Sequence, residues 1–195
     1  MVSSARRLGL SVQTTGVDST GSWVRNASLK AAFLLEARQQ HRGPLLYVDV
    51  DAVFHRNPWP QLAQYECDIA LYRENGRLLS GTILLNDSPQ TLNLLEEWKT
   101  RSEINPDIWD QVVLQEILDQ DQALETVYSV ERLPATFCWI FDRLTKVRDD
   151  HVFIEHLQAS RQAKGAEKRG RNKSLERRAA RVETIEKILA IGEAG

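Results

Sequence analysis

The chain has 195 residues, of which 42% are hydrophobic and 27% charged, a composition typical of a globular protein rather than a disordered or fibrous one. This length suggests one domain with at most an appendage. Two cysteines are too few for a disulfide framework, and no apolar run approaches the roughly 20 residues that cross a bilayer. Together with an N-terminus that lacks an apolar signal core, these features predict a cytoplasmic protein.

The net charge of −2 conceals an uneven distribution. Residues 1–160 carry 15 basic and 22 acidic side chains, a balance of −7, whereas residues 161–195 carry 10 and 5, a balance of +5. We therefore predict an acidic body at 1–160 and a basic, partly helical tail at 161–195. The favoured interpretation of the tail is a solvated extension. The alternatives are contact with an anionic lipid or nucleic acid, or docking of its apolar stripe on the body or on another subunit.

The first third of the chain predicts two helices and two strands. Ser3–Leu10 reads as the end of a helix, and Ser11–Val17 reads as a strand. A helix is expected over Arg25–Gln40, and Gly43-Pro44 ends it. The apolar run Leu45–Val48 is then typical of a strand buried on both faces.

The rest of the body alternates further strands and helices, which favours the α/β class. The Asn75-Gly76 pair suits a type I′ hairpin turn between two strands. The sequence Asn86–Pro89 is expected to start a helix, and Pro106–Leu118 to form another. The predicted strands of this part are Asp68–Arg73, Leu78–Leu85, Glu125–Val130 and Val152–Glu155.

Asp49 and Asp51 come directly after the apolar run. Aspartates at positions i and i+2 of an extended chain project to the same side, and strand ends are where open α/β sheets bind ligands. Two converging carboxylates repel each other unless a cation joins them. Mg²⁺ or Mn²⁺ fits, because these ions take oxygen ligands at about 2.0–2.2 Å and share them with substrate phosphates. The pair alone is equally compatible with an acidic loop that caps the next turn.

The segment LLYVDVDAVFHRNPWP, residues 45–60, resembles the strand, DxD motif and proline turn of the nucleotide-diphospho-sugar transferases. These are GT-A glycosyltransferases of the glycogenin-like and bacterial galactosyltransferase-like kind. The resemblance covers about residues 3–162 and implies a Rossmann-like mixed sheet flanked by helices. Five further segments resemble family segments in the family's order: WVRNASLKAAFLL, SGTILLND, WDQVVLQEIL, LPATFCWIFD and FIEHLQASR.

The resemblance implies a metal centre and a nucleotide-sugar donor such as a UDP-sugar. Asp51 would bind Mn²⁺ or Mg²⁺ directly, Asp49 would contact the metal and the ribose, and His156 would be the third ligand. A histidine without such a motif is more often structural. Lys30 would hold the diphosphate or the donor sugar as a point charge. Its alternative is a solvated helix lysine.

The resemblance also implies residues around the two sugars. Ser80 and Gly81 would line the donor sugar, although Gly81 could instead mark a bulge in a core strand. Asp110 and Gln111 would lie at the reacting sugar as catalytic residues, although an aspartate there also suits an ordinary helix start. The remaining implied contacts are Arg161 with phosphate oxygens, and Trp109 and Trp139 with the acceptor.

These assignments predict a metal-dependent glycosyltransferase that acts with retention on a glycan, protein or lipid acceptor. The family normally opens with a strand that grips the nucleotide base, and here the sequence begins at the segment matching the helix after it. One alternative is therefore a degenerate, non-catalytic GT-A module. Besides the donor and acceptor, the expected partners of the chain are a second copy or a tail-mediated contact. The other is a haloacid-dehalogenase-like phosphatase, which also uses a DxD with Mg²⁺.

Overall fold

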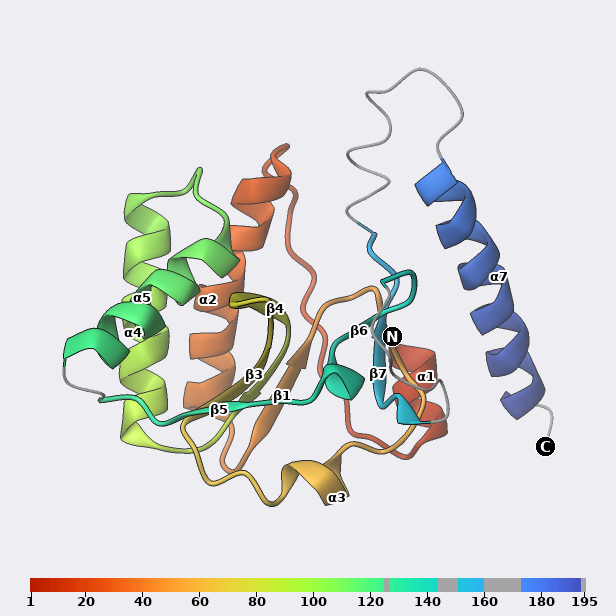
Figure 1. Ribbon diagram of the computed structural model, residues 1–195, viewed down its shortest axis with the longest axis horizontal. Coiled ribbons are helices and arrows are strands. Elements are labelled where there is room, and N and C mark those ends of the chain that lie inside the picture. Colours follow the sequence, from red (N-terminus) through yellow and green to blue (C-terminus); the bar gives the residue numbers. More distant parts are fainter. Residues whose placement is uncertain (125–126, 144–150, 160–172, 194–195) are drawn as a thin grey trace. The chain divides into compact units, whose positions relative to one another are not determined.

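The computed structural model describes residues 1–124, 127–143, 151–159 and 173–193 (Figure 1). The chain forms two compact units, each made of segments that are distant in sequence. Unit 1 comprises Met1–Gly16, Asp49–Pro60 and Ala135–Gly195, and unit 2 comprises Val17–Val48 and Gln61–Pro134.

Unit 2 contains a four-stranded sheet with the order β1-β4-β3-β5. β1 and β3 pair antiparallel with β4, whereas β5 is parallel to β3. The β3–β4 turn confirms the hairpin, because Asn75 has a φ of 50° and Gly76 a φ of 80°, as a type I′ turn requires. The strands are β1 (Leu45–Val48), β3 (Ile69–Glu74), β4 (Arg77–Leu85) and β5 (Val130–Arg132).

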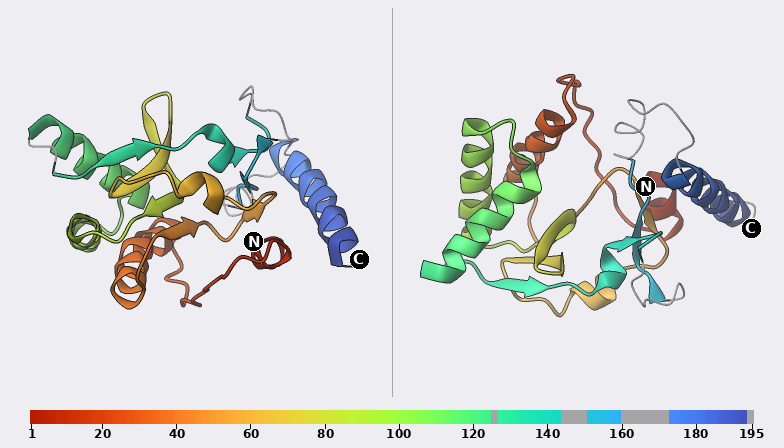
Figure 2. Two further views of the ribbon diagram at one scale, coloured as in Figure 1. Left: turned by 90° about the horizontal axis from the view of Figure 1, so that it is seen from below. Right: turned by 45° about the horizontal axis from the view of Figure 1, so that its top comes forward.

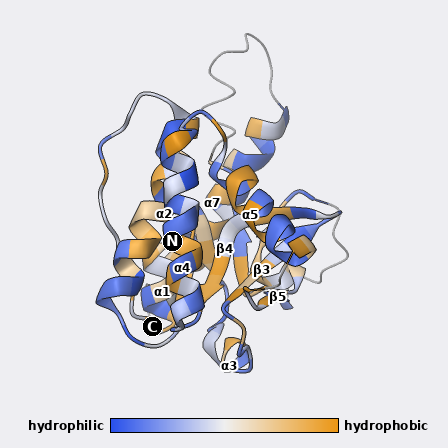
Figure 3. Ribbon diagram, turned by 90° about the vertical axis from the view of Figure 1, so that its left-hand side faces the viewer, coloured by the Kyte–Doolittle hydropathy of each residue, from blue (hydrophilic) through white to orange (hydrophobic). Residues whose placement is uncertain are grey.

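Three helices pack with this sheet around the main hydrophobic core. They are α2 (Trp23–Gln40), α4 (Pro89–Ile104) and α5 (Asp110–Leu124). The predicted helix start at Asn86–Pro89 is confirmed, since the Ser88 hydroxyl accepts a hydrogen bond from the amide of Thr91. Trp98 of α4 is fully buried among leucines and isoleucines of the strands, which appear hydrophobic in Figure 3.

Unit 1 contains a smaller sheet with the order β2-β7-β6. β2 pairs antiparallel with β7, and β6 pairs parallel with it. Its elements are α1 (Val2–Arg7), β2 (Ala52–Phe54), the 3₁₀ turn η1 (Ala135–Phe137), β6 (Trp139–Ile140), β7 (Ile154–His156) and α7 (Lys173–Glu193). The short helix α3 (Trp59–Leu62) lies where the chain passes from one unit to the other.

One predicted strand is absent, one is shifted and one differs in burial. The strand expected at Glu125–Val130 is found at Val130–Arg132. Ser11–Val17 forms no strand, because no ladder pairs it with a described strand and a strand requires a partner. Leu45–Val48 is the strand β1, but it is only partly buried along its whole length. The reason is its position at the edge of the sheet, where β4 is its single neighbour.

The predicted helix in the tail is confirmed for residues 173–193, but the solvated state favoured for the tail was wrong. These residues form the 21-residue helix α7 (Figure 2). Its apolar stripe packs against unit 1, and Ile185 is buried beside Val53 and Leu157. Spacings of three and four residues place Val182, Ile185 and Leu189 on one face of the helix. None of the helices in the described ranges combines the length and hydrophobicity that a membrane span needs.

Candidate metal and donor site

Three of the predicted ligands lie together in unit 1. One ligand atom from each of Asp49, Asp51 and His156 lies within 4.8 Å of the others. The two aspartates come from the turn before β2, and His156 is the last residue of β7. The antiparallel pairing of β2 with β7 sets Ala52 opposite His156, which brings the histidine to the aspartates across 105 residues of chain.

Hydrogen bonds hold Asp51 in place. Its Oδ2 accepts a 2.6 Å bond from the amide of Ala159, and its backbone oxygen accepts one from the amide of Leu157. Burial acts to raise the pKa of Asp51, but the His156 imidazole, the Ala159 amide and the charge of Arg178 outweigh it, so the pKa is lowered. The carboxylate is therefore ionised at neutral pH and suited to a cation.

His156 is almost fully buried, and its Nδ1 lies 3.5 Å from Asp51 Oδ1. Burial acts to lower its pKa, but Cys138, Asp51 and Asp49 outweigh it and raise the pKa to about 10. A proton on the imidazole thus neutralises part of the acidic cluster. A divalent ion at the same place would take over that role after displacing the proton.

A second cluster, in unit 2, joins three more of the predicted residues. Lys30 Nζ lies 2.8 Å from Asp110 Oδ2 and 3.0 Å from Ser80 Oγ. The same ammonium lies 5.0 Å from the centre of the Tyr47 ring, a cation–π contact that the sequence did not indicate. The Lys30 side chain is only 9% exposed, so it is not the solvated helix lysine of the alternative interpretation.

Asp110 has one carboxylate oxygen without a hydrogen bond. It is fully buried at the start of α5, and Ser80 Oγ and Lys30 both contact its Oδ2. Within the described ranges, Oδ1 has no hydrogen-bond partner although it is inaccessible to solvent. Buried acceptors are rarely left unpaired, which makes this oxygen unusual among the described polar groups. Gly81 and Gln111 are the chain neighbours of Ser80 and Asp110, and Gln111 is half-buried.

The remaining predicted residues occupy different environments. Trp109 is 38% exposed and packs edge-to-face on Trp23, with ring centres 5.2 Å apart. Trp139 is buried in unit 1, where the Arg181 guanidinium lies 5.6 Å from its ring centre. Arg161 lies outside the described residues. The structure also brings two residues to the metal cluster that no local sequence pattern indicates. Cys138 lies beside His156, and Arg178 lies near Asp51.

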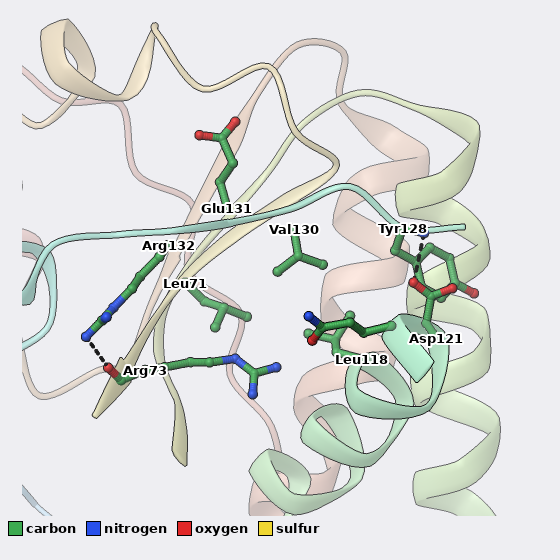
Figure 4. Close-up of a pocket in the computed structure, with 9 residues that line it drawn as sticks. Leu71, Arg73, Leu118, Asp121, Tyr128, Val130, Glu131 and Arg132 are labelled. Carbon is green, nitrogen blue, oxygen red and sulfur yellow. Dashed lines mark hydrogen bonds between the residues drawn. The ribbon is translucent and has the colours of Figure 1, made fainter. Parts of the chain in front are cut away.

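A hollow of about 240 Å³ lies elsewhere in unit 2, between β5 and α5 (Figure 4). None of the predicted site residues lines it. Its polar groups bind one another, since Asp121 accepts from the amides of Val127 and Tyr128 and Arg132 donates to the backbone oxygen of Arg73. We therefore treat each polar cluster as a candidate site within its own unit, and not this hollow.

The mixed α/β architecture thus brings Asp49, Asp51 and His156 together in unit 1 through the β2–β7 pairing. The sequence profile of the nucleotide-diphospho-sugar transferases matches residues 32–171, well over half of the chain. The chain belongs to this family, as its sequence motifs predict. A search of curated proteins gave no match.

One of three similar solved structures supports the same fold, and all three have low sequence identity. A glycosyltransferase involved in glycosylation of the major capsid of PBCV-1 is 10% identical, with 82% of this chain and 83% of that chain covered and a TM-score of 0.53. Mouse xyloside xylosyltransferase 1 is 15% identical, with 67% and 64% covered and a TM-score of 0.44. The galactosyltransferase LgtC is 12% identical, with 69% and 60% covered and a TM-score of 0.46. The chain thus spans less than two thirds of the mouse enzyme and of LgtC.

Proposed function

We propose that this protein is a metal-dependent glycosyltransferase that moves a sugar from a nucleoside-diphosphate donor to an acceptor. The observation that carries the proposal is the convergence of Asp49, Asp51 and His156. Membership of the nucleotide-diphospho-sugar transferase family supports it independently. This membership also leaves the phosphatase alternative without support.

The donor atoms fit a Mn²⁺ or Mg²⁺ ion. Two carboxylates suit both ions, and an imidazole is a ligand that Mn²⁺ accepts more readily than Mg²⁺. Such an ion supplies Lewis-acid neutralisation of the diphosphate as it leaves. Asp51 and His156 would hold the ion, and Asp49 would contact both the ion and the ribose. His156 must be neutral to act as a ligand, so its proton leaves when the ion binds.

The Lys30–Ser80–Asp110 cluster supports a binding site for the donor sugar. Lys30 and Ser80 both bind Asp110 Oδ2 and would orient this carboxylate beside the donor sugar. Ser80 and Gly81 would line the sugar, and Gln111 would lie at the reacting carbon. Arg161 would contact the phosphates. Asp110 Oδ2 is bound to Lys30 and Ser80, and Oδ1 is inaccessible, so we favour retention through front-face attack over a covalent intermediate on Asp110.

The acceptor would be a glycan, protein or lipid, and the exposed Trp109 is the best candidate for contact with it. A UDP-sugar is the preferred donor. Division into a catalytic domain at 1–160 and a tail at 161–195, a cytoplasmic location and homo-oligomer formation remain predictions from the sequence.

Calorimetric titration with UDP and GDP tests the proposal. Binding of one nucleotide in the presence of Mn²⁺, lost on chelation, is the expected result. The matched enzymatic test is slow release of sugar from the corresponding donor, again dependent on metal. Failure to bind either nucleotide with Mn²⁺ present would overturn the proposal in favour of a non-catalytic GT-A module.

A further inference from the structure

Helix α7 presents two arginines, one turn apart, to strand β7. Arg181 forms a two-point ion pair with Glu155, and its charge is therefore neutralised. Arg178 instead donates a 2.8 Å hydrogen bond from Nε to the backbone oxygen of Leu157. The Arg181 guanidinium is therefore paired with a carboxylate, whereas no described carboxylate pairs with that of Arg178.

Arg178 has hydrogen-bond donors that no described residue occupies. Its one hydrogen bond uses Nε, which leaves both Nη groups without a partner within the described part of the chain. No described carboxylate lies within ion-pair distance of it, and the side chain is half-buried, so solvent screens its charge incompletely. A half-buried guanidinium with two unused Nη groups is well suited to an anionic ligand.

The position of Arg178 links it to the metal centre. Leu157, which accepts its hydrogen bond, directly follows His156, and the Leu157 amide donates to the backbone oxygen of Asp51. The positive charge of Arg178 also contributes to the lowered pKa of Asp51. All of these residues belong to unit 1.

Charge balance indicates which ligand this arginine would bind. Two carboxylates and one divalent ion sum to zero when His156 is neutral. A diphosphate brought to that ion therefore adds negative charge that the metal cluster itself does not neutralise. Guanidinium groups bind phosphate oxygens in a two-pronged geometry.

We propose that Arg178 of α7 binds the diphosphate of the nucleotide-sugar donor beside the metal ion, which makes the C-terminal helix part of the donor site. This inference rests on the proposed function. It differs from a purely structural role, in which Arg178 would only fasten α7 to the backbone of β7.

The test compares Arg178→Gln and Arg178→Lys with the matched control Arg177→Gln. Arg177 neighbours Arg178 on α7, is 63% exposed and lies 3.8 Å from Asp142. Mn²⁺ binding without nucleotide is followed by electron paramagnetic resonance. Binding of pyrophosphate, UDP and GDP with Mn²⁺ present is followed by calorimetry.

Arg178→Gln should weaken binding of pyrophosphate and of the nucleoside diphosphate by about tenfold or more, the usual effect of losing a charge-assisted hydrogen bond. Mn²⁺ affinity should stay the same or increase, since a nearby positive charge is gone. Arg178→Lys should restore part of the loss, and Arg177→Gln should change nothing.

Two results would overturn the inference: unchanged pyrophosphate affinity in Arg178→Gln, or an equal loss of Mn²⁺ affinity and of thermal stability, which would indicate a structural role. A wild-type protein that binds pyrophosphate through Arg178 but neither nucleotide would sustain the inference and overturn the proposed donor instead.

Discussion

Arg181 on helix α7 holds Glu155 on strand β7 through two hydrogen bonds of 2.7 and 2.8 Å. The Glu155 side chain is fully buried, and it also receives a 2.7 Å contact from His55 Nε2. The next residue along β7 is His156, the candidate metal ligand. The C-terminal helix is therefore fastened to the strand that carries the histidine of the metal centre.

Replacing Arg181 should destabilise unit 1. Arg181→Met keeps the aliphatic length but leaves Glu155 buried with only His55 as partner, and breaking a buried ion pair costs about 3–5 kcal/mol. Urea unfolding and hydrogen exchange of the α7 amides measure this loss. The control Lys187→Met removes an exposed pair with Glu183 on the same helix and should change the free energy of unfolding by less than about 0.5 kcal/mol. Equal stability of the two variants would contradict the anchoring role.

Acid should weaken the same anchor. Burial acts to raise the pKa of Glu155, but His55 and Arg181 outweigh it, and the pKa is lowered from 4.5. A carboxylate with a depressed pKa in the folded state contributes stability above its unfolded pKa and loses it as pH falls through the folded value. We therefore expect the free energy of unfolding to decrease below about pH 4.5. Glu155→Gln should be less stable at pH 7 and show a flatter decrease in acid. A wild-type profile as flat as that of the variant would exclude the ion pair as the cause.

Metal affinity should increase with pH. Since the pKa of His156 is raised to about 10, the imidazole carries a proton at pH 7 and must release it to bind an ion. Mn²⁺ affinity should rise by about tenfold per pH unit between pH 7 and pH 9, with one proton released per ion. Conversely, the imidazolium–carboxylate contact stabilises the metal-free fold below pH 6.5 and is lost as pH rises towards 10.

Calorimetry in two buffers of different ionisation enthalpy counts the protons that are released when Mn²⁺ binds. His156→Gln should bind Mn²⁺ more weakly and without this pH dependence, and a pH-independent wild type would exclude His156 as a ligand.

Lys30 and Asp110 should be strongly coupled in stability. Lys30→Met leaves the fully buried Asp110 carboxylate without its counter-charge, so we expect a loss of about 3 kcal/mol or more in the free energy of unfolding. Adding Asp110→Asn should recover part of that loss, because a buried neutral amide needs no cation. The free energies of unfolding of Lys30→Met, Asp110→Asn and the double variant, measured in urea, complete a double-mutant cycle with the wild type. Additive losses would show that the 2.8 Å contact contributes no net coupling.

Local sequence patterns predicted part of the fold and two of the three candidate metal ligands. The spacing of Asp49 and Asp51, the hairpin at Asn75-Gly76 and the helix start at Ser88 each depend on a few neighbouring residues. His156 is different, because the β2–β7 pairing that brings it to the aspartates spans 105 residues. Only the order of family motifs indicated its role.

Other features depend on contacts that no local pattern encodes. Ser11–Val17 was predicted as a strand, but a strand forms only where another strand supplies hydrogen bonds, and no described strand does so here. The apolar run Leu45–Val48 suggested a buried position, whereas pairing order makes it an edge. The charge of the tail suggested solvation, and its docking through Arg181 requires a buried glutamate elsewhere in the sequence.

Asp51 provides the most direct test of the metal centre. Asp51→Asn keeps an oxygen that can accept the hydrogen bond from the Ala159 amide, and it removes the charge. We expect its free energy of unfolding to stay within about 1 kcal/mol of wild type, because a ligand is lost and not a core group. Mn²⁺ affinity should decrease by at least about 100-fold, and metal-dependent nucleotide binding should disappear, since the carboxylate is the stronger ligand for a hard cation. Asp51→Ala should do the same at a somewhat larger cost in stability.

The exposed Asp18, changed to asparagine, is the matched control for the loss of one negative charge. Donor hydrolysis at the wild-type rate in either Asp51 variant would exclude Asp51 as a metal ligand and, with it, the assignment of this cluster as the catalytic centre.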